Sequence, residues 1–294
     1  MLLNNYTSIR QNFEAIDRKL YQLSPESYKV SMDGCGLFGY TNLVDPKKII
    51  DVGISEQLAC QVLFGLSISN DTKVYLSGMS SFILRRSYEQ LKLYINNEVP
   101  NVTIIGYGSG VSYGALGPSH HIEEDLALLK LLDNIKVYVP HSIQSFEKKL
   151  IHNLDEKFPV YFRIPNELPN NLLLHGKYLE ENVDEDITLY KKPEISKKLI
   201  IVTGFLTQSI IDKFKEEPGI DVMSIEVLKK LNIIKLLLNS YLEIEIIQDA
   251  RSDTGIIPLI LEQLDTTKKI TIKGFDKHKT GANLSEMLKI NNLI

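Results

Sequence analysis

Short apolar runs alternate with longer amphipathic segments along most of the 294-residue chain. The runs at 74–76, 102–105 and 136–139 are mainly apolar, which is typical of strands buried on both faces of a sheet. The segment 8–23 instead places its apolar residues at helical spacing. Regular alternation of strands and helices predicts an α/β fold with parallel sheets.

The pattern divides the chain into two α/β domains, 1–165 and 197–294. In the first, helices are expected at 8–23, 55–68, 82–96, 123–132 and 144–154, and strands at 29–32, 48–52, 74–76, 102–105, 136–139 and 160–164. In the second, smaller domain, strands are expected near 199–204, 221–225, 243–247 and 270–272, and helices at 208–215 and 255–264. Residues 166–196 are polar and acidic and contain Pro and Asn, so we expect a linker with some short strand.

Composition and charge exclude several classes of protein. The chain is 44% hydrophobic and 24% charged, as in an ordinary globular protein, and its net charge of −4 argues against nucleic-acid binding. Cys35 and Cys60 form no CxxC pair, so we expect no structural zinc and a reducing, cytoplasmic location. Neither a signal peptide nor an apolar run long enough to cross a membrane is expected.

The first candidate for chemistry is the stretch D-V-G-I-S-E-Q at 51–57, where a predicted strand leads into a helix. Ligands of open α/β sheets bind at such strand ends. By position alone, Glu56 is an acid stabilised by the helix dipole. The stretch, however, resembles the D-x-G-I-x-E-Q signature of transketolases and deoxyxylulose-phosphate synthases. The resemblance implies that Glu56 faces the aminopyrimidine of thiamine diphosphate and favours the imino tautomer that activates the cofactor. Ile54 and Asp33 are expected beside the cofactor as well.

A second stretch, from Ser77 to Gln90, resembles the S-T-F-x-x-F-x-x-x-R-A-x-E-Q sequence of the family. The family uses its aromatic residues here to hold the aminopyrimidine. Phe82 matches the second aromatic position, whereas Met79 stands where the first is usually Phe or Tyr. Composition alone would make Phe82 a core residue.

A third stretch, at 117–127, reads G-P-S-H-H-I-E-E-D-L-A and resembles the family sequence G-P-T-H-Q-x-x-E-D-L-A. The resemblance makes His120 a catalytic residue that contacts substrate hydroxyls. It implies that His121, which stands where the family has Gln, binds substrate as well. An exposed histidine pair is otherwise an ordinary polar surface. The preceding glycines do not form a dinucleotide-binding G-x-G-x-x-G, because Val111 and Tyr113 interrupt them.

Two arginines match positions with which the family binds substrate phosphate. Arg10 precedes Asp33 at the expected spacing, and Arg163 ends a predicted strand. A planar guanidinium suits phosphate because it can donate two parallel hydrogen bonds. For either arginine alone, a surface salt bridge is the ordinary role.

The resemblance extends over the whole chain, with 1–165 similar to the pyrimidine-binding domain of transketolases and 197–294, more weakly, to their C-terminal domain. The G-D-G motif with its later Asn, which holds the diphosphate and Mg²⁺ in the family, is missing. The resemblance therefore implies a partner subunit that carries this motif and most of the metal site. An α₂β₂ heterotetramer is the natural closed assembly.

Three replacements affect the expected substrate. Gly108, Leu116 and Leu37 stand where transketolases usually have His, Asp and Ser, which suggests a modified or nucleotide-linked sugar. Three functions stay open. The first is ketol transfer between sugars by a split transketolase. The second is a carboligase reaction, as in a 2-oxoacid dehydrogenase β-type subunit or deoxyxylulose-phosphate synthase, and the third is a non-catalytic scaffold subunit.

Overall fold

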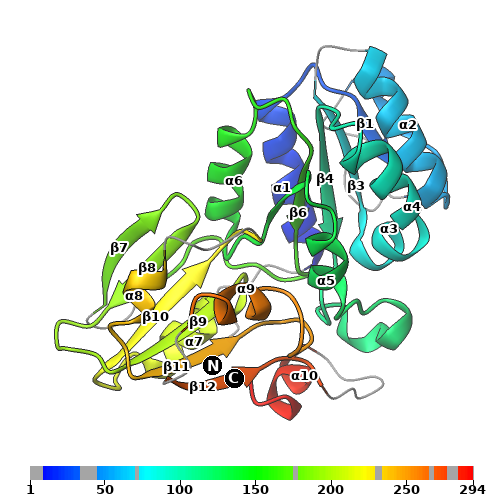
Figure 1. The fold of residues 1–294 in the computed structure, drawn as a ribbon. Helices are drawn as coiled ribbons and strands as arrows, with labels where there is room; N and C mark the ends of the chain where they lie inside the picture. The colour runs from blue at the N-terminus through cyan, green and yellow to red at the C-terminus, as the bar shows by residue number, and fades with distance from the viewer. Residues whose placement is uncertain are drawn as a thin grey trace.

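The computed structural model describes residues 9–33, 45–69, 73–174, 178–228, 234–264, 268–276 and 284–293. These residues form two α/β domains, each built on a six-stranded sheet (Figure 1). We call them the first and second domains in chain order. The predicted fold class of two α/β domains is confirmed.

The sheet of the first domain is entirely parallel, with the strand order β2-β1-β3-β4-β6-β5. Its strands are β1 Lys29–Ser31, β2 Ile49–Asp51, β3 Val74–Met79, β4 Val102–Tyr107, β5 Lys136–Tyr138 and β6 Val160–Arg163. Residues 102–105 are fully buried because helices cover both faces of the sheet (Figure 1). All these strands therefore end at the same edge, where the candidate residues lie.

Helices α1 (Ile9–Leu23) and α6 (Ile143–His152) pack together on one face of this sheet, and α2 (Glu56–Ser69) and α3 (Ser80–Arg86) cover the other (Figure 1). The single helix expected at 82–96 is interrupted after α3. Ser87 donates its hydroxyl hydrogen to the carbonyl of Ile83, a local bond that competes with helix continuation. The chain continues as α4 (Tyr88–Gln90) and a π-helical turn, η3 (Leu91–Asn96).

The loop after β4 contains a 3₁₀ segment, η4 (Gly114–Ser119), and leads into α5 (Asp125–Lys130). The second sheet has the order β12-β11-β9-β10-β8-β7. Its strands are β7 Leu179–Asp184, β8 Ile187–Lys191, β9 Lys198–Thr203, β10 Ile220–Ile225, β11 Glu243–Ile247 and β12 Lys269–Lys273. Its helices are α7 Leu206–Phe214, α8 Lys235–Leu238, α9 Ile257–Leu261 and α10 Leu284–Ile290.

Strands β7 and β8 lie within 166–196, the segment expected to be a linker. They form an antiparallel hairpin, and β8 pairs antiparallel with β10. The second sheet is thus mixed rather than wholly parallel. The turn between β7 and β8 is short, which permits only antiparallel pairing.

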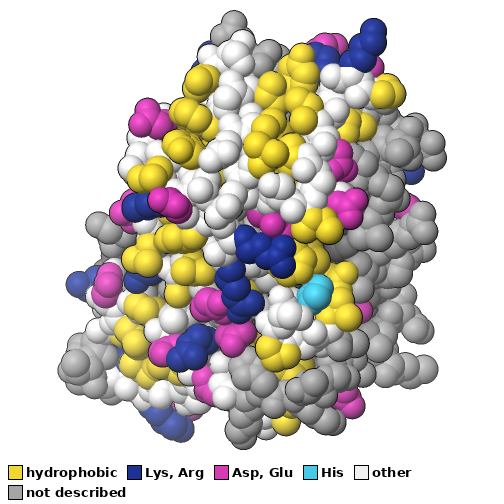
Figure 2. All heavy atoms as spheres, turned by 90° about the vertical axis from the view of Figure 1, so that its right-hand side faces the viewer, with side chains coloured by type: hydrophobic (Ala, Val, Ile, Leu, Met, Phe, Trp, Pro, Cys, Tyr) yellow, Lys and Arg dark blue, Asp and Glu magenta, His cyan; other side chains and the backbone are white. Residues whose placement is uncertain are grey.

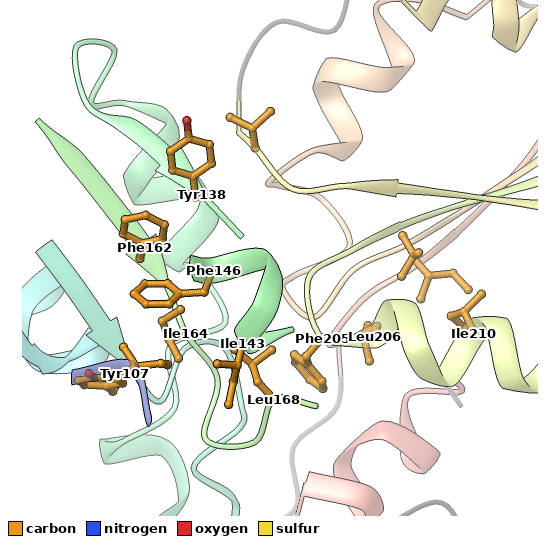
Figure 3. Close-up of a cluster of buried hydrophobic side chains, with 14 of the residues drawn as sticks. Tyr107, Tyr138, Ile143, Phe146, Phe162, Ile164, Leu168, Phe205, Leu206 and Ile210 are labelled. Carbon is orange, nitrogen blue, oxygen red and sulfur yellow. The ribbon is translucent and has the colours of Figure 1, made fainter. Parts of the chain in front are cut away.

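The two domains share one continuous apolar core (Figure 3). The ring of Phe162 stacks on Tyr138 at 5.4 Å between centroids and meets the edge of Phe146 at 4.8 Å. Figure 3 shows these rings on the first-domain side, with Phe205, which precedes α7, and Leu206 of α7 on the second-domain side. Backbone bonds also link β5 to the chain after β10, including that from Val139 N–H to the carbonyl of Glu226 at 2.8 Å.

A buried charge network supports the same junction. Glu226 lies 2.8 Å from Nδ1 of His141 and 3.6 Å from the ammonium of Lys149, and Ser145 donates a hydrogen bond to it. Burial raises the pKa of Glu226, but His141 and Lys149 outweigh it and hold the pKa at about 2. A carboxylate of the second domain is therefore held charged by side chains of the first.

We expect Phe162→Ala to lower the free energy of unfolding by about 3–5 kcal/mol, because it leaves a cavity beneath Tyr138 and Phe146. Urea unfolding followed by circular dichroism measures the loss. Phe162→Leu is the matched control, and it should cost about 1–2 kcal/mol because most apolar contacts are kept. Equal losses for the two variants would show that the rings do not pack as described.

Candidate active site

Three side chains from the three candidate stretches meet at the carboxyl ends of the first-domain strands. Glu56 begins α2, Phe82 lies in α3 after β3, and His120 follows η4 in the loop after β4. Arg86 connects them: its Nη1 lies 2.7 Å from Oε1 of Glu56, and its guanidinium lies 4.0 Å from the centroid of the Phe82 ring. The ring of His120 meets Phe82 edge-on at 5.1 Å. The structure thus brings Glu56, Phe82 and His120 into one cluster.

The turn before α2 positions the carboxyl group of Glu56. Gly53 has φ +68°, and its N–H donates to Oδ1 of Asp51 at 2.8 Å, which turns the chain from β2 into the helix. The Glu56 side chain is only 8% exposed and lies at the positive end of the α2 dipole. Ile54, in contrast, is 75% exposed and adds apolar surface beside the cluster.

Arg86 is the site residue for which the sequence predicted no role. It occupies a family position in the stretch from Ser77 to Gln90, but nothing in that stretch assigned it a contact. The available signal was its spacing of four residues from Phe82, which places both side chains on one face of α3. A guanidinium over an aromatic face is a favourable cation–π contact, so Arg86 orients both Phe82 and Glu56.

His120 is half-buried between aromatic rings. Its Nδ1 lies 2.9 Å from the hydroxyl oxygen of Ser119, and the Tyr113 ring lies 5.3 Å away between centroids. Partial burial and then the positive charge of Arg86 lower the pKa of His120 below its usual value. The neutral imidazole, which can accept as well as donate a hydrogen bond, is therefore favoured.

His121 does not point outward as predicted. Its side chain is 2% exposed, and Nε2 lies 3.0 Å from the carbonyl oxygen of Gly114. The imidazole therefore supports the inside of the loop. Contact of His121 with substrate stays a prediction, and the structure buries its side chain.

Arg163 is also placed differently from the prediction. It is 1% exposed, donates from Nε at 2.8 Å and Nη2 at 3.1 Å to Asp125, and donates from Nη1 at 2.6 Å to Asp249. Four hydrogen bonds, including one from Nη2 to the Asp249 carbonyl, use four of the five N–H groups of the guanidinium. Burial raises the pKa of Asp125 to about 6, even though the positive charge of Arg163 acts in the opposite direction. The guanidinium is therefore bonded to buried carboxylates, and the predicted contact with substrate phosphate stays a prediction.

Asp33 and Arg10 are the remaining predicted residues. Asp33, at the end of β1, is exposed with φ +56°, and its N–H donates to Oδ1 of Asp51 at 2.9 Å. Arg10 belongs to α1, but its side chain lies outside the described part of the structure, as does Leu37. Among the contacts of the described residues, none joins Asp33 to Glu56.

Met79, Gly108 and Tyr113 lie next to one another. Gly108 has φ +65°, and a Cβ atom placed on it would lie 2.9 Å from the Tyr113 ring and 3.6 Å from the Met79 methyl group. The Tyr113 ring therefore borders the space that a side chain at position 108 would need. Gly108 stands where transketolases usually have His. In this chain the ring of Tyr113, rather than a side chain at position 108, lies beside His120.

Figure 2 shows the face of the molecule on which α2, α3 and the loop after β4 lie. Hydrophobic side chains run in bands over its upper part, above a group of Lys, Arg, Asp and Glu side chains near its middle. Two arginines of α3 form ion pairs, Arg86 with Glu56 and Arg85 with Glu124. Among the described helices, none combines the length and apolarity needed to cross a membrane.

Comparison with known proteins gives the family context. The family model for the transketolase pyrimidine-binding domain matches residues 23–170. One subunit of the apulose-4-phosphate transketolase of Phocaeicola vulgatus is 30% identical over 165 residues, covering 55% of this chain and 53% of that protein. The corresponding subunit from Actinobacillus succinogenes is 27% identical over 185 residues, covering 62% and 57%. A 1-deoxy-D-xylulose-5-phosphate synthase of Kocuria rhizophila is 32% identical over 108 residues, covering 37% and 16%.

The chain thus spans little more than half the length of these two transketolase subunits. Solved structures extend the similarity of fold over nearly the whole chain. The inactive β4 tetramer of a split-gene transketolase has a TM-score of 0.74 and 18% identity, covering 97% of this chain and 93% of its own. The transketolase of Campylobacter jejuni has a TM-score of 0.75 and 14% identity, covering 98% and 45%.

We expect Arg86→Gln to raise the pKa of His120, because removing a nearby positive charge favours the protonated imidazole. Histidine titration by NMR, with His120→Gln to assign the resonance, measures the shift. Arg85→Gln is the matched control: Arg85 pairs with Glu124 and should change the pKa of His120 less. A larger shift from Arg85→Gln than from Arg86→Gln would contradict the described arrangement.

Proposed function

Since the chain belongs to the transketolase family through its pyrimidine-binding domain, we propose that it is one subunit of a split, thiamine diphosphate-dependent transketolase. Such an enzyme transfers a two-carbon ketol unit between sugars. The observation that carries the proposal is the cluster of Glu56, Phe82 and His120 at one sheet edge. The match to the synthases covers less of this chain than the match to the transketolase subunits, which favours ketol transfer over a carboligase reaction.

The residues of the cluster fit the pyrimidine half of the cofactor. Glu56 provides a nearly buried carboxyl group that can hold a proton at a ring nitrogen, and Phe82 provides an aromatic surface. A carboxylate has about four acceptor sites, so the bond from Arg86 leaves Glu56 able to accept another. When bound, thiamine diphosphate supplies the nucleophilic carbon that carries the ketol unit. His120, favoured as the neutral imidazole, would orient substrate hydroxyls beside it.

The proposal includes a partner subunit with the G-D-G motif, which holds the diphosphate and Mg²⁺, in a cytoplasmic α₂β₂ assembly. Two similarities support it. The sequence relatives are themselves single subunits of a transketolase, and the β4 tetramer of similar fold, which belongs to a split-gene enzyme, is inactive. This chain lacks the G-D-G…N motif in its sequence.

We propose a sugar substrate that differs from the common pentose phosphates. The two transketolase subunits of similar sequence are named for apulose-4-phosphate, a sugar phosphate. Here Met79, Gly108 and Tyr113 give the site a different wall beside His120, and Arg163 is engaged elsewhere. A modified or nucleotide-linked sugar therefore stays the proposed class. Better turnover of xylulose 5-phosphate than of every modified sugar tested would contradict this part.

We expect Glu56→Gln to lower turnover by at least about 100-fold, because the amide cannot supply the carboxyl proton. This chain is co-expressed with a G-D-G-containing partner, and the purified complex is titrated with thiamine diphosphate and Mg²⁺ and assayed for ketol transfer. Glu124→Gln is the matched control, since it removes a carboxylate that pairs with Arg85 instead. Unchanged turnover in Glu56→Gln would favour a scaffold subunit, and CO₂ release from a 2-oxoacid would favour a carboligase.

A further inference from the structure

We propose that the second domain positions the active-site loop: Asp249, acting through Arg163 and Asp125, holds residues 110–122 in the geometry that presents His120. The inference rests on the proposed function only for the role of His120. Asp249 is a positioning residue, because it touches the base of the loop and not the cluster around Glu56.

We call Arg163, Asp125 and Asp249 the clamp, because the guanidinium lies between carboxylates from the two domains. Arg163 ends β6, Asp125 begins α5, and Asp249 follows β11 of the second sheet. Each of the three side chains is at most 1% exposed. Because a buried charge is tolerated only when it is paired, Arg163 and the two carboxylates depend on one another.

The clamp is bonded directly to both ends of the loop. Oδ2 of Asp125 accepts a hydrogen bond from Gly110 N–H at 3.0 Å, and Ile122 N–H donates to the carbonyl of Gly110 at 2.7 Å. The Arg251 N–H, two residues after Asp249, donates to the carbonyl of Glu123 at 3.0 Å. The loop therefore starts and ends on groups that Asp125 and the second domain hold.

Close packing prevents a side chain at Gly110. Its φ is +60°, and a Cβ atom there would lie 2.6 Å from the Asp249 carbonyl oxygen and 2.8 Å from Nη2 of Arg163. The backbone of the loop is thus pressed against the clamp, so a displacement of Asp249 must move the loop base.

Hydrogen bonds within the loop connect its base to His120, so a movement of the base also moves His120. His121 supports the loop from inside through the carbonyl of Gly114, and His120 N–H donates to the carbonyl of Gly117 at 3.0 Å. The His120 ring then packs on Phe82 and Tyr113. An imidazole placed by this loop is sensitive to its tilt, since a misplacement of about 1 Å can cost about 100-fold in rate.

The test compares Asp249→Asn with Glu226→Gln. Both neutralise a buried second-domain carboxylate that pairs with first-domain side chains, but only Asp249 contacts the loop. Hydrogen exchange on the full chain follows the amides of 110–122, and thermal unfolding gives Tm. Steady-state kinetics of the assembled enzyme separate kcat from KM.

We expect Asp249→Asn to speed exchange over 110–122 and to lower kcat at least 10-fold. Glu226→Gln should lower Tm by a similar amount and leave both loop exchange and kcat unchanged. Equal effects of the two variants on the loop, or a lower Tm in Asp249→Asn without faster exchange, would overturn the proposal. If Asp249→Asn does not fold, Asp249→Glu, which keeps the charge and displaces it, is measured against the same criteria.

The exchange measurement needs neither substrate nor partner. An assembly without ketol-transfer activity, whose loop still loosens specifically in Asp249→Asn, would contradict the proposed function and leave the positioning role intact. An active assembly in which Asp249→Asn leaves exchange over 110–122 unchanged would support the proposed function and contradict the positioning role.

Discussion

The buried guanidinium of Arg163 imposes a constraint that reaches across the molecule. Its charge is removed from water, so carboxylates must surround it, and among the described residues of the first domain Asp125 supplies one. The second carboxylate, Asp249, comes from the other sheet and fixes how the two domains meet. The continuous core between Phe162 and α7 adds an apolar contribution to the same junction. The second domain is thereby tied to the loop that carries His120.

The parallel sheet explains why three distant stretches form one site. Strands β2, β3 and β4 all end at the same edge, so the segments that follow them carry Glu56, Phe82 and His120 into proximity. Topology alone leaves the side chains unoriented. Arg86 supplies the orientation, because it bonds to Glu56 and covers the Phe82 ring at the same time.

The sequence predicted most of this architecture because the strands of a parallel sheet are short and apolar and their helices amphipathic. Of the candidate site, it located Glu56, Phe82 and His120 through their motifs, but motifs do not report burial. Arg163 and His121 were predicted to meet ligands, whereas the structure buries both. Asp249, which pairs with Arg163, lies 86 residues further along the chain, and a local sequence pattern cannot predict a pair so far apart. The hairpin β7–β8 was expected only as short strand in a linker, since β7 is polar and mostly exposed and its sequence resembles a loop.

Two departures from the family pattern lie side by side in the site. Met79 and Gly108 are distant in sequence and adjacent in space, and the ring of Tyr113 borders the room that a side chain at Gly108 would take. A subunit that had merely lost its function would be expected to accumulate independent losses throughout the site. Here Met79 and Gly108 form one wall with Tyr113, while Glu56, Phe82 and His120 remain connected through Arg86. A reshaped wall around an intact cluster is the arrangement that a change of substrate requires, and it argues against a purely structural subunit.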